Sequence, residues 1–257
     1  MTRGRIAACL ALVAALVLAG CENGKEPSYQ GWVEADLLFI GPDEAGRIQT
    51  LSVREGEQVA QRAPLFSLDA ELQLADLAMQ EAAVKNAQQA FERAQALLKT
   101  NAGTQKAYED AEAAQRTAQA RLNSSQTRLA RRKVFSPADG TIQQIYFRVG
   151  EMVPAGRAVV SLLPPGNLKL RFFVNEAVLP QIKIGDMVNV HCDGCSGDLT
   201  AKISFISRTS EFTPPVIYSL EERSKLVFMI EARTEQPERL RVGQPVSITL
   251  AAQGGAP

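Results

Sequence analysis

Residues 46–68 read GRIQTLSVREGEQVAQRAPLFSL, and residues 140–162 read GTIQQIYFRVGEMVPAGRAVVSL. The two stretches align without a gap at a constant offset of 94 residues, and nine of the 23 aligned positions are identical. In each half, apolar residues are spaced for short strands around a glycine suited to a tight turn. Because internal repetition indicates architecture, we expect one small β-domain built from two distant segments, 46–69 and 137–163.

The stretch between the halves, residues 70–136, has a different periodicity. An apolar residue recurs every seven positions in its first arm, at Leu77, Val84, Phe91 and Leu98. The return arm keeps the same spacing at Tyr108, Gln115, Leu122 and Leu129. Residues 101–104 separate the arms, and no proline occurs between Pro64 and Pro137. This heptad pattern predicts an antiparallel coiled-coil hairpin.

Each arm of the hairpin has about 30 residues and would reach roughly 45 Å. Alanines at many seam positions would let the two backbones approach closely, and Leu74, Ala87 and Ala94 are expected to complete the seam of the first arm. The alternative is that both helices pack on a globular core. We disfavour it because the apolar stripe is narrow and polar residues cover most of the remaining surface.

The first 20 residues have the features of a secretion signal. Arg3 and Arg5 precede an apolar run at 6–18 that is too short for an ordinary membrane span. The run ends in Leu-Ala-Gly before Cys21, a pattern that resembles the lipobox of bacterial lipoproteins. The resemblance implies that Cys21 becomes a lipid-bearing N-terminus. The alternative is an ordinary signal peptide followed by an incidental cysteine.

The net charge of the chain without residues 1–20 argues against nucleic acid as a partner. Removal of residues 1–20 takes away two of the 28 basic side chains and none of the 28 acidic ones, which leaves a net charge of −2. There is no basic excess to attract nucleic acid, and no second hydrophobic stretch could span a bilayer. We therefore expect a lipid-anchored protein whose body lies in an aqueous extracytoplasmic compartment.

The rest of the chain is predicted to be mostly β. Residues 21–29 are expected to form a lipidated tether, and residues 30–45 a strand that contributes to a β-barrel. Strand-like runs recur through residues 164–252, with one short helical candidate at 176–182, so this region is expected to form the barrel itself. Residues 211–225 form a long loop of unassigned role. The expected fold class is mostly β with a long α-helical hairpin: an elongated assembly of β-sandwich, β-barrel and antiparallel coiled coil.

The two half-motifs resemble the biotinyl and lipoyl carrier domains, in which a strand, a Glu-Gly turn and a valine precede an apolar strand. In those carriers the halves adjoin, and a lysine at the tight turn between them bears the cofactor. Here Asp69 leads into a helix and the lysine is absent. Carrier function is therefore excluded, and no cofactor is expected.

A lipoyl-like domain split by a coiled-coil hairpin, followed by a β-barrel and preceded by a lipobox, resembles the HlyD-like periplasmic adaptors, also called membrane fusion proteins. The resemblance covers essentially the whole mature chain. It implies an adaptor in a tripartite efflux or secretion system that links an inner-membrane transporter, preferably of the ABC type, to an outer-membrane duct. It also implies a ring of several copies in the periplasm, held by lipid at the inner membrane.

The resemblance extends to the end of the hairpin. Adaptors of this family that dock on a duct resembling TolC carry an arginine, a leucine four residues later and a serine seven residues after that. Arg93, Leu97 and Thr104 stand at these spacings here. Arg93 and Leu97 share one helix face, and Thr104 keeps the hydroxyl while adding a methyl group. The alternative is a solvated arginine, a seam leucine and an ordinary helix N-cap.

The sequence from His191 to Cys195 is the only constellation that suggests chemistry. Asp-Gly between strands is a strong turn signal, so Cys192 and Cys195 on either side of it are expected to form a structural disulfide. The alternatives are a zinc or copper site with His191, a redox centre, or free thiols. A periplasmic metal-binding or thiol-redox lipoprotein is thus the alternative function, and a cell-envelope scaffold without a transporter is a third. No catalytic constellation stands out, so we do not expect an enzyme.

Overall fold

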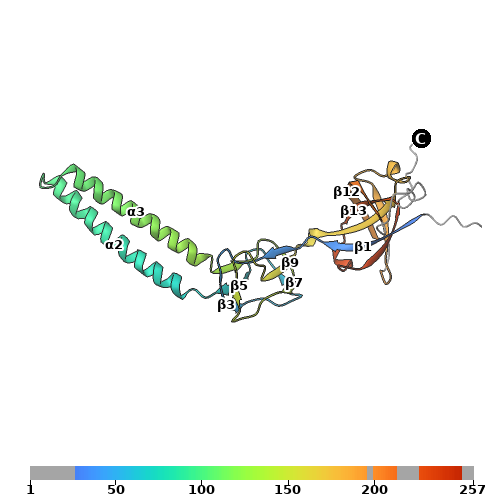
Figure 1. The fold of residues 1–257 in the computed structure, drawn as a ribbon, viewed down its shortest axis with the longest axis horizontal. Coiled ribbons are helices and arrows are strands. Elements are labelled where there is room, and N and C mark those ends of the chain that lie inside the picture. Colours follow the sequence, from blue (N-terminus) through green and yellow to red (C-terminus); the bar gives the residue numbers. More distant parts are fainter. Residues whose placement is uncertain (1–26, 196–198, 213–225, 251–257) are drawn as a thin grey trace, which may run out of the picture. The chain divides into compact units, whose positions relative to one another are not determined.

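The computed structural model describes residues 27–195, 199–212 and 226–250, and the chain divides into two compact units. Residues 35–167 form the first, called here the hairpin unit. The described residues before and after this range form the second, called here the barrel unit. Figure 1 shows the elements coloured along the chain. The predicted fold class, mostly β with a long helical hairpin, is confirmed.

Two four-stranded sheets form a β-sandwich in the hairpin unit. One sheet has, in spatial order, β6 (Lys133–Phe135), β5 (Pro64–Leu68), β3 (Gly46–Leu51) and β8 (Met152–Val153). The other has β2 (Leu38–Ile40), β9 (Val160–Leu163), β7 (Gly140–Ile145) and β4 (Gln58–Val59). Each half of the repeat sends one short strand into the sheet of the other half. The sandwich is therefore assembled from both halves and cannot form from either alone.

The hydrogen bonds between the two halves follow the symmetry of the repeat. The amide of Gly56 donates to the carbonyl of Ile142 at 2.8 Å, and the equivalent amide of Gly150 donates to the carbonyl of Ile48 at 2.8 Å. Both glycines have positive φ, +83° and +94°, a conformation that glycine adopts without steric cost. Geometry thus explains why glycine is repeated at this position.

The other repeated residues also have physical reasons. A carboxylate oxygen of Glu57 accepts a hydrogen bond from the amide of Arg54 at 2.9 Å, and Glu151 accepts one from Arg148 at the same distance. The repeated apolar positions supply buried side chains to one core between the sheets. That core contains Ile48, Val53, Val59, Leu65, Phe66, Leu68, Ile142, Val153, Val159, Val160 and Leu162.

The helices α2 (Glu71–Lys99) and α3 (Gln105–Ala130) form the hairpin that interrupts the repeat. Helix α2 follows β5 and α3 leads into β6, and these two strands are paired, with Ser67 opposite Lys133. The two ends of the hairpin are therefore held side by side by one sheet. Figure 1 shows α2 and α3 running next to each other along their length.

The two helices pack on each other through the predicted seam. Phe91 and Tyr108 are in ring contact at 5.4 Å between centroids, and Gln115 donates a hydrogen bond to the side chain of Gln88 at 2.7 Å. In the two helices, Ser125 is the one residue that is buried, so the helices do not lie flat on the sandwich. The expectation for Leu74 was wrong: this side chain is 55% exposed, and Gln73 is half-buried in its place.

A closed six-stranded barrel makes up the barrel unit. Its strands in spatial order are β1 (Ser28–Ala35), β10 (Leu168–Asn175), β13 (Leu226–Thr234), β12 (Leu199–Phe212), β11 (Met187–His191) and β14 (Pro245–Leu250). Short 3₁₀ helices occur at η1 (Pro165–Asn167, in the hairpin unit), η2 (Leu179–Gln181) and η4 (Pro237–Arg239). The helical candidate at 176–182 is thus a turn followed by η2. Of the loop predicted at 211–225, residues 213–225 lie outside the described residues.

The segment 30–45 does not form one barrel strand as expected. Its first part belongs to β1, which pairs with β14 and helps to close the barrel, but β2 pairs with β9 in the sandwich, with Leu38 opposite Leu162. Between β1 and β2, the amide of Asp36 donates to the carbonyl of Asn167 at 3.0 Å, and the Asn167 side chain donates back to the carbonyl of Asp36 at 2.8 Å. Leu38 and Ile40 pack against the sandwich core, which explains why β2 joins that unit.

A group of charged side chains lies in the barrel unit where β1 and β10 adjoin. Lys169 and Arg171 both contact one carboxylate oxygen of Glu231 at 3.0 Å, and Arg171 also pairs with Glu34 at 2.8 Å. Burial on its own would raise the pKa of Glu231, but hydrogen bonds and charge interactions with Lys169 and Arg171 outweigh it and hold the pKa below its usual value of 4.5. The folded barrel therefore favours the ionised form.

We expect Glu231→Gln to destabilise the barrel at neutral pH by on the order of 3 kcal/mol, because Lys169 and Arg171 lose a buried counter-charge. The unfolded chain takes up a proton at Glu231 more readily than the folded one, so this stabilisation is complete above about pH 4.5 and is lost as the pH falls below it. The measurement is urea unfolding followed by the fluorescence of Trp32, the single tryptophan. An equal difference between the two proteins at pH 7 and pH 3 would contradict this account.

Candidate partner-binding site at the hairpin tip

The turn at the hairpin tip is folded around the backbone of Leu97. Its carbonyl accepts hydrogen bonds from the amides of Ala102 at 2.9 Å and Gly103 at 3.0 Å. Asn101 takes a positive φ of +58°, which asparagine tolerates better than most residues. A Cβ added at Gly103 would lie 3.0 Å from the Cβ of Leu97, so the close approach favours glycine. The turn therefore fixes the position of Leu97 relative to the start of α3.

Thr104 is the N-cap of α3. Its side-chain oxygen accepts a hydrogen bond from the amide of Ala107 at 3.1 Å, and its backbone is extended, as expected at an N-cap. The capping interaction uses the oxygen as acceptor, and the hydroxyl hydrogen can still be donated outward. The exposed position of Thr104 is compatible with both a cap and a partner contact.

Arg93 and Leu97 lie on the outside of α2, one helical turn apart. Leu97 is 50% exposed, whereas its neighbour Leu98 is half-buried in the seam. Arg93 is exposed and forms no ion pair within the described part of the chain. The tip thus combines an apolar side chain and a guanidinium that no interaction within the hairpin requires. Such a surface suits a helical partner that offers a pocket and an acceptor.

Arg132 at the base of the hairpin was not singled out from the sequence. It is 8% exposed, and its guanidinium donates to the carbonyl of Ala45 at 3.0 Å and to the carboxylate of Glu44 at 2.9 Å. Its own carbonyl accepts from the amide of Leu68 at 2.8 Å. These contacts fasten the end of α3 to both sides of the first repeat half. The only sequence signal is its place one residue before β6.

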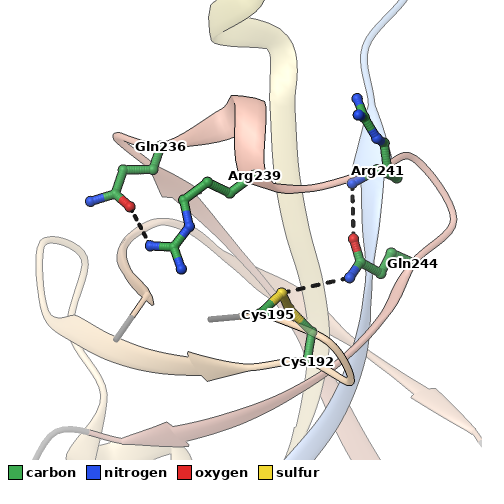
Figure 2. Close-up of a disulfide and its surroundings, with 6 residues drawn as sticks. All are labelled: Cys192, Cys195, Gln236, Arg239, Arg241 and Gln244. Atoms are coloured by element: carbon green, nitrogen blue, oxygen red, sulfur yellow. Dashed lines mark hydrogen bonds between the residues drawn. A yellow bond between two sulfur atoms is a disulfide. The ribbon is translucent and has the colours of Figure 1, made fainter. Parts of the chain in front are cut away.

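Cys192 and Cys195 are joined by a disulfide at the end of β11, with their Cα atoms 5.4 Å apart. Figure 2 shows that Gln244 points at this bond. Its side-chain nitrogen lies 3.7 Å from the sulfur of Cys195, and its side-chain oxygen accepts from the amide of Arg241 at 3.0 Å. The Gln244 side chain therefore links the disulfide at the end of β11 to the turn that precedes β14.

His191 is turned toward a strand of the barrel. Its ring nitrogen Nε2 lies 3.4 Å from the hydroxyl of Thr249 on β14. Among the described residues, no three histidine, cysteine, aspartate or glutamate side chains come close enough together to hold a metal ion. In this structure the two sulfurs are bonded to each other, and a metal site at Cys192 and Cys195 would need them as free thiolates.

Reduction of the disulfide is expected to cost the barrel about 2 kcal/mol, because the bond closes a loop of only four residues and restrains the unfolded chain modestly. Urea unfolding followed by Trp32 fluorescence, with and without a dithiol reductant, measures this cost. The double variant Cys192→Ser/Cys195→Ser should be insensitive to the reductant. Equal sensitivity of the variant, or labelling of Cys192 and Cys195 by a thiol reagent in the oxidised, denatured protein, would contradict the assignment.

The predicted lipidation site, Cys21, lies outside the described residues. Among the helices that the structure describes, none combines the length and the apolar character needed to cross a membrane.

No protein-family model matches the chain. A "UPF0194 membrane protein" of Acidithiobacillus ferridurans is 30% identical over 182 residues, which cover 68% of this chain and 53% of the relative. Another UPF0194 membrane protein, from Citrobacter koseri, is 27% identical over 218 residues, covering 68% of this chain and 66% of the relative. The chain thus spans about half to two thirds of the length of these relatives.

Solved structures resemble nearly the whole chain. A MacA–MexA chimeric protein carrying the α-hairpin domain of Pseudomonas aeruginosa MexA aligns with a TM-score of 0.73 and 22% identity, covering 88% of this chain and 82% of that one. The membrane fusion protein Spr0693 of Streptococcus pneumoniae aligns with a TM-score of 0.69 and 17% identity, covering 88% and 100%. MacA of Actinobacillus actinomycetemcomitans aligns with a TM-score of 0.62 and 20% identity, covering 88% and 79%. The predicted resemblance is confirmed at the level of the fold.

Proposed function

We propose that this chain, which has the fold of the membrane fusion proteins, is the periplasmic adaptor of a tripartite efflux or secretion system. It links a transporter in the inner membrane to a duct in the outer membrane. It does so by binding and coupling, not by catalysis. The transporter is of the ABC type in this proposal, a choice that rests on the resemblance to lipid-anchored adaptors with short hairpins.

The hairpin carries the proposal. In a carrier domain, the turn between the two halves presents a lysine on a movable arm. In this chain the same place holds two helices of 29 and 26 residues, whose ends are fixed by the β5–β6 pairing and by buried Arg132. A rod whose two chain ends are both fixed at its base transmits position and force to its tip, which is what a bridge between two membrane proteins requires.

The tip supports contact with the duct. Leu97 offers exposed apolar area, Arg93 offers a cation without a partner in the described chain, and the Thr104 hydroxyl can donate a hydrogen bond. Arginine and large apolar side chains are frequent anchors of protein interfaces. The duct in this proposal resembles TolC, and Arg93, Leu97 and Thr104 form the contact.

The N-terminal segment holds the protein at a membrane in this proposal. Cys21 carries lipid in this proposal, and the residues after it lead to β1, which begins at Ser28 rather than at residue 30 as predicted. Two acyl signals on one residue are sufficient for stable anchoring. The protein therefore acts in the periplasm from the surface of the inner membrane, and several copies assemble into a ring around the transported substrate.

Replacing both tip residues, Arg93→Ala and Leu97→Ala, is expected to weaken duct binding at least about tenfold, because a loss of 1.4 kcal/mol of contact energy has that effect. Both side chains are exposed, so helix content and thermal unfolding should not change. Binding is measured by cross-linking and by surface-immobilised duct protein. Lys106→Ala, an exposed change near the tip, serves as control. Undiminished duct binding by the double variant would disprove the tip contact.

Variants of Thr104 distinguish capping of helix α3 from contact with the duct. Thr104→Ser keeps the capping oxygen and the donor, so it should retain both helix stability and duct binding, whereas Thr104→Ala should lose about 1 kcal/mol of helix stability. If Thr104→Ala weakens duct binding by more than the loss of about 1 kcal/mol of helix stability explains, Thr104 contacts the duct directly. Equal binding by the two variants limits Thr104 to capping.

Cys21→Ser is expected to release the protein from the membrane fraction, because the thiol that receives the lipid is gone. Fractionation of cells and the mass of the N-terminal peptide measure this. Cys9→Ser is a matched control, since Cys9 lies in the segment that processing removes. A variant at Cys21 that remains bound to the membrane, or an unmodified N-terminal peptide in the wild type, would refute the anchor.

A further inference from the structure

The Cys192–Cys195 disulfide lies at the end of a strand that the barrel already holds on both sides. Strand β11 pairs with β12 on one side and with β14 on the other, as far as His191 opposite Ser247. The bond joins residues only three positions apart, and closing so short a loop restrains the unfolded chain modestly. The barrel can therefore keep its fold when this bond is opened.

The two sulfurs of the bond have different surroundings. Both cysteines are half-buried, but Cys192 lines a surface pocket that crosses β1, β14 and the end of β11. Gln30 donates to the hydroxyl of Ser247 at 3.1 Å within this pocket, and His191 also lines it. Cys195 is not among the described residues that line it. A molecule in the pocket would thus meet Cys192 first.

The sulfur of Cys195 has a hydrogen-bond donor beside it. Nε2 of Gln244 lies 3.7 Å from this sulfur, as Figure 2 shows. The glutamine is held in place because its side-chain oxygen accepts from the amide of Arg241 at 3.0 Å and its carbonyl accepts from the amide of Val33 at 2.9 Å. A disulfide sulfur is a weak acceptor, whereas a thiolate is charged and accepts a stronger hydrogen bond. Gln244 is therefore placed to stabilise a thiolate on Cys195.

We propose that Cys192–Cys195 is a thiol–disulfide exchange site, at which a dithiol attacks Cys192 and Cys195 leaves as the thiolate. One thiolate of the dithiol forms a bond to Sγ of Cys192 while the Sγ–Sγ bond breaks, and the electron pair of that bond stays on Cys195. Gln244 donates to this thiolate, which then takes a proton from water.

The second thiol of the dithiol completes the reaction. As a thiolate, it attacks the sulfur of its own molecule in the mixed disulfide, and Cys192 leaves as a thiolate that takes a proton from water. The dithiol is oxidised to a disulfide, and the protein gains two electrons and two protons. The site thus needs no reactant other than the dithiol.

The backbone around the two cysteines favours a dithiol over a single thiol. The amide of Cys195 donates to the carbonyl of Cys192 at 3.1 Å, and Gly194 between them has a φ of +81°, so this turn does not require the disulfide. A Cys195 thiolate released by a single thiol would stay beside the mixed disulfide and close the original bond again, because its effective concentration there is high. A dithiol resolves the mixed disulfide with its own second sulfur.

Reaction rates in the folded protein and in a reference peptide test the site. The protein, purified at full length in detergent, and an oxidised, amidated peptide of residues 187–195 are each mixed with dithiothreitol, and the masses of the alkylated products are followed. We expect the folded protein to react about tenfold faster, the effect of one hydrogen bond to a charged group. A folded protein that reacts more slowly than the peptide would overturn the proposal, since burial protects a purely structural disulfide.

The variant Gln244→Glu tests the donor. It keeps an oxygen that can accept from the amide of Arg241, but it replaces the N–H group beside Cys195 with a carboxylate oxygen. Its reaction with dithiothreitol should slow about tenfold, to the rate of the peptide. Gln236→Glu makes the same charge change at an exposed glutamine that bonds to Arg239 instead (Figure 2), and it should react like the wild type. Equal rates in the two variants would overturn the role of Gln244.

Glutathione, a single thiol, identifies the sulfur that is attacked. A brief reaction stopped with excess alkylating reagent should place glutathione on Cys192 and the alkyl group on Cys195, as read from fragmentation of the peptide that contains both. Glutathione mainly on Cys195 would overturn the proposal, and so would a fully reduced protein whose Trp32 fluorescence shows an unfolded barrel. The inference does not depend on the adaptor function, and no duct or membrane is present in these assays.

Discussion

The exchange of backbone hydrogen bonds between the two repeat halves is the constraint on which the hairpin unit depends. Gly56 is bonded to Ile142 and Gly150 to Ile48, while the amides of Ile142 and Ile48 bond back to the carbonyls of Glu57 and Glu151 at 2.9 Å. Buried backbone groups must find partners, and these four amides find theirs in the other half. The chain must therefore return over the whole hairpin before the sandwich can close.

This closure also determines the hairpin. Because β5 and β6 are neighbours, the helices that follow and precede them must run antiparallel and begin side by side. The seam needs only modest apolar area, since its ends are already fixed by the sheet, and it can include a polar contact such as Gln88–Gln115. The outer faces are then free of any demand from folding, and Arg93 and Leu97 lie there.

The sequence predicted those features that rest on local causes. The repeated glycine marks a positive φ, and the repeated glutamate caps its turn, so the halves could be found by comparison alone. The split of 30–45 into β1 and β2 depends on pairing with β14 and β9, two strands that lie more than 100 residues further along the chain. Leu74 was misplaced because the seam row of Ala87 and Ala94 continues in steps of seven to Gln73, so Leu74 lies one residue off the seam. The exposure of Leu97, which defines the candidate tip site, required the fold of the turn at residues 100–104.

The comparison with a carrier domain shows what the insertion changes. A carrier uses the turn between its halves as the base of a movable arm, whose value lies in its freedom. Here the same two strands receive a helix pair, and the bonds of Arg132 to Ala45, Glu44 and Leu68 remove freedom at the joint. Motion at the tip must then be shared with the sandwich, because no flexible residue separates the buried Arg132 from β6. The joint that bears a movable arm in a carrier domain is thus closed here by a buried, hydrogen-bonded arginine.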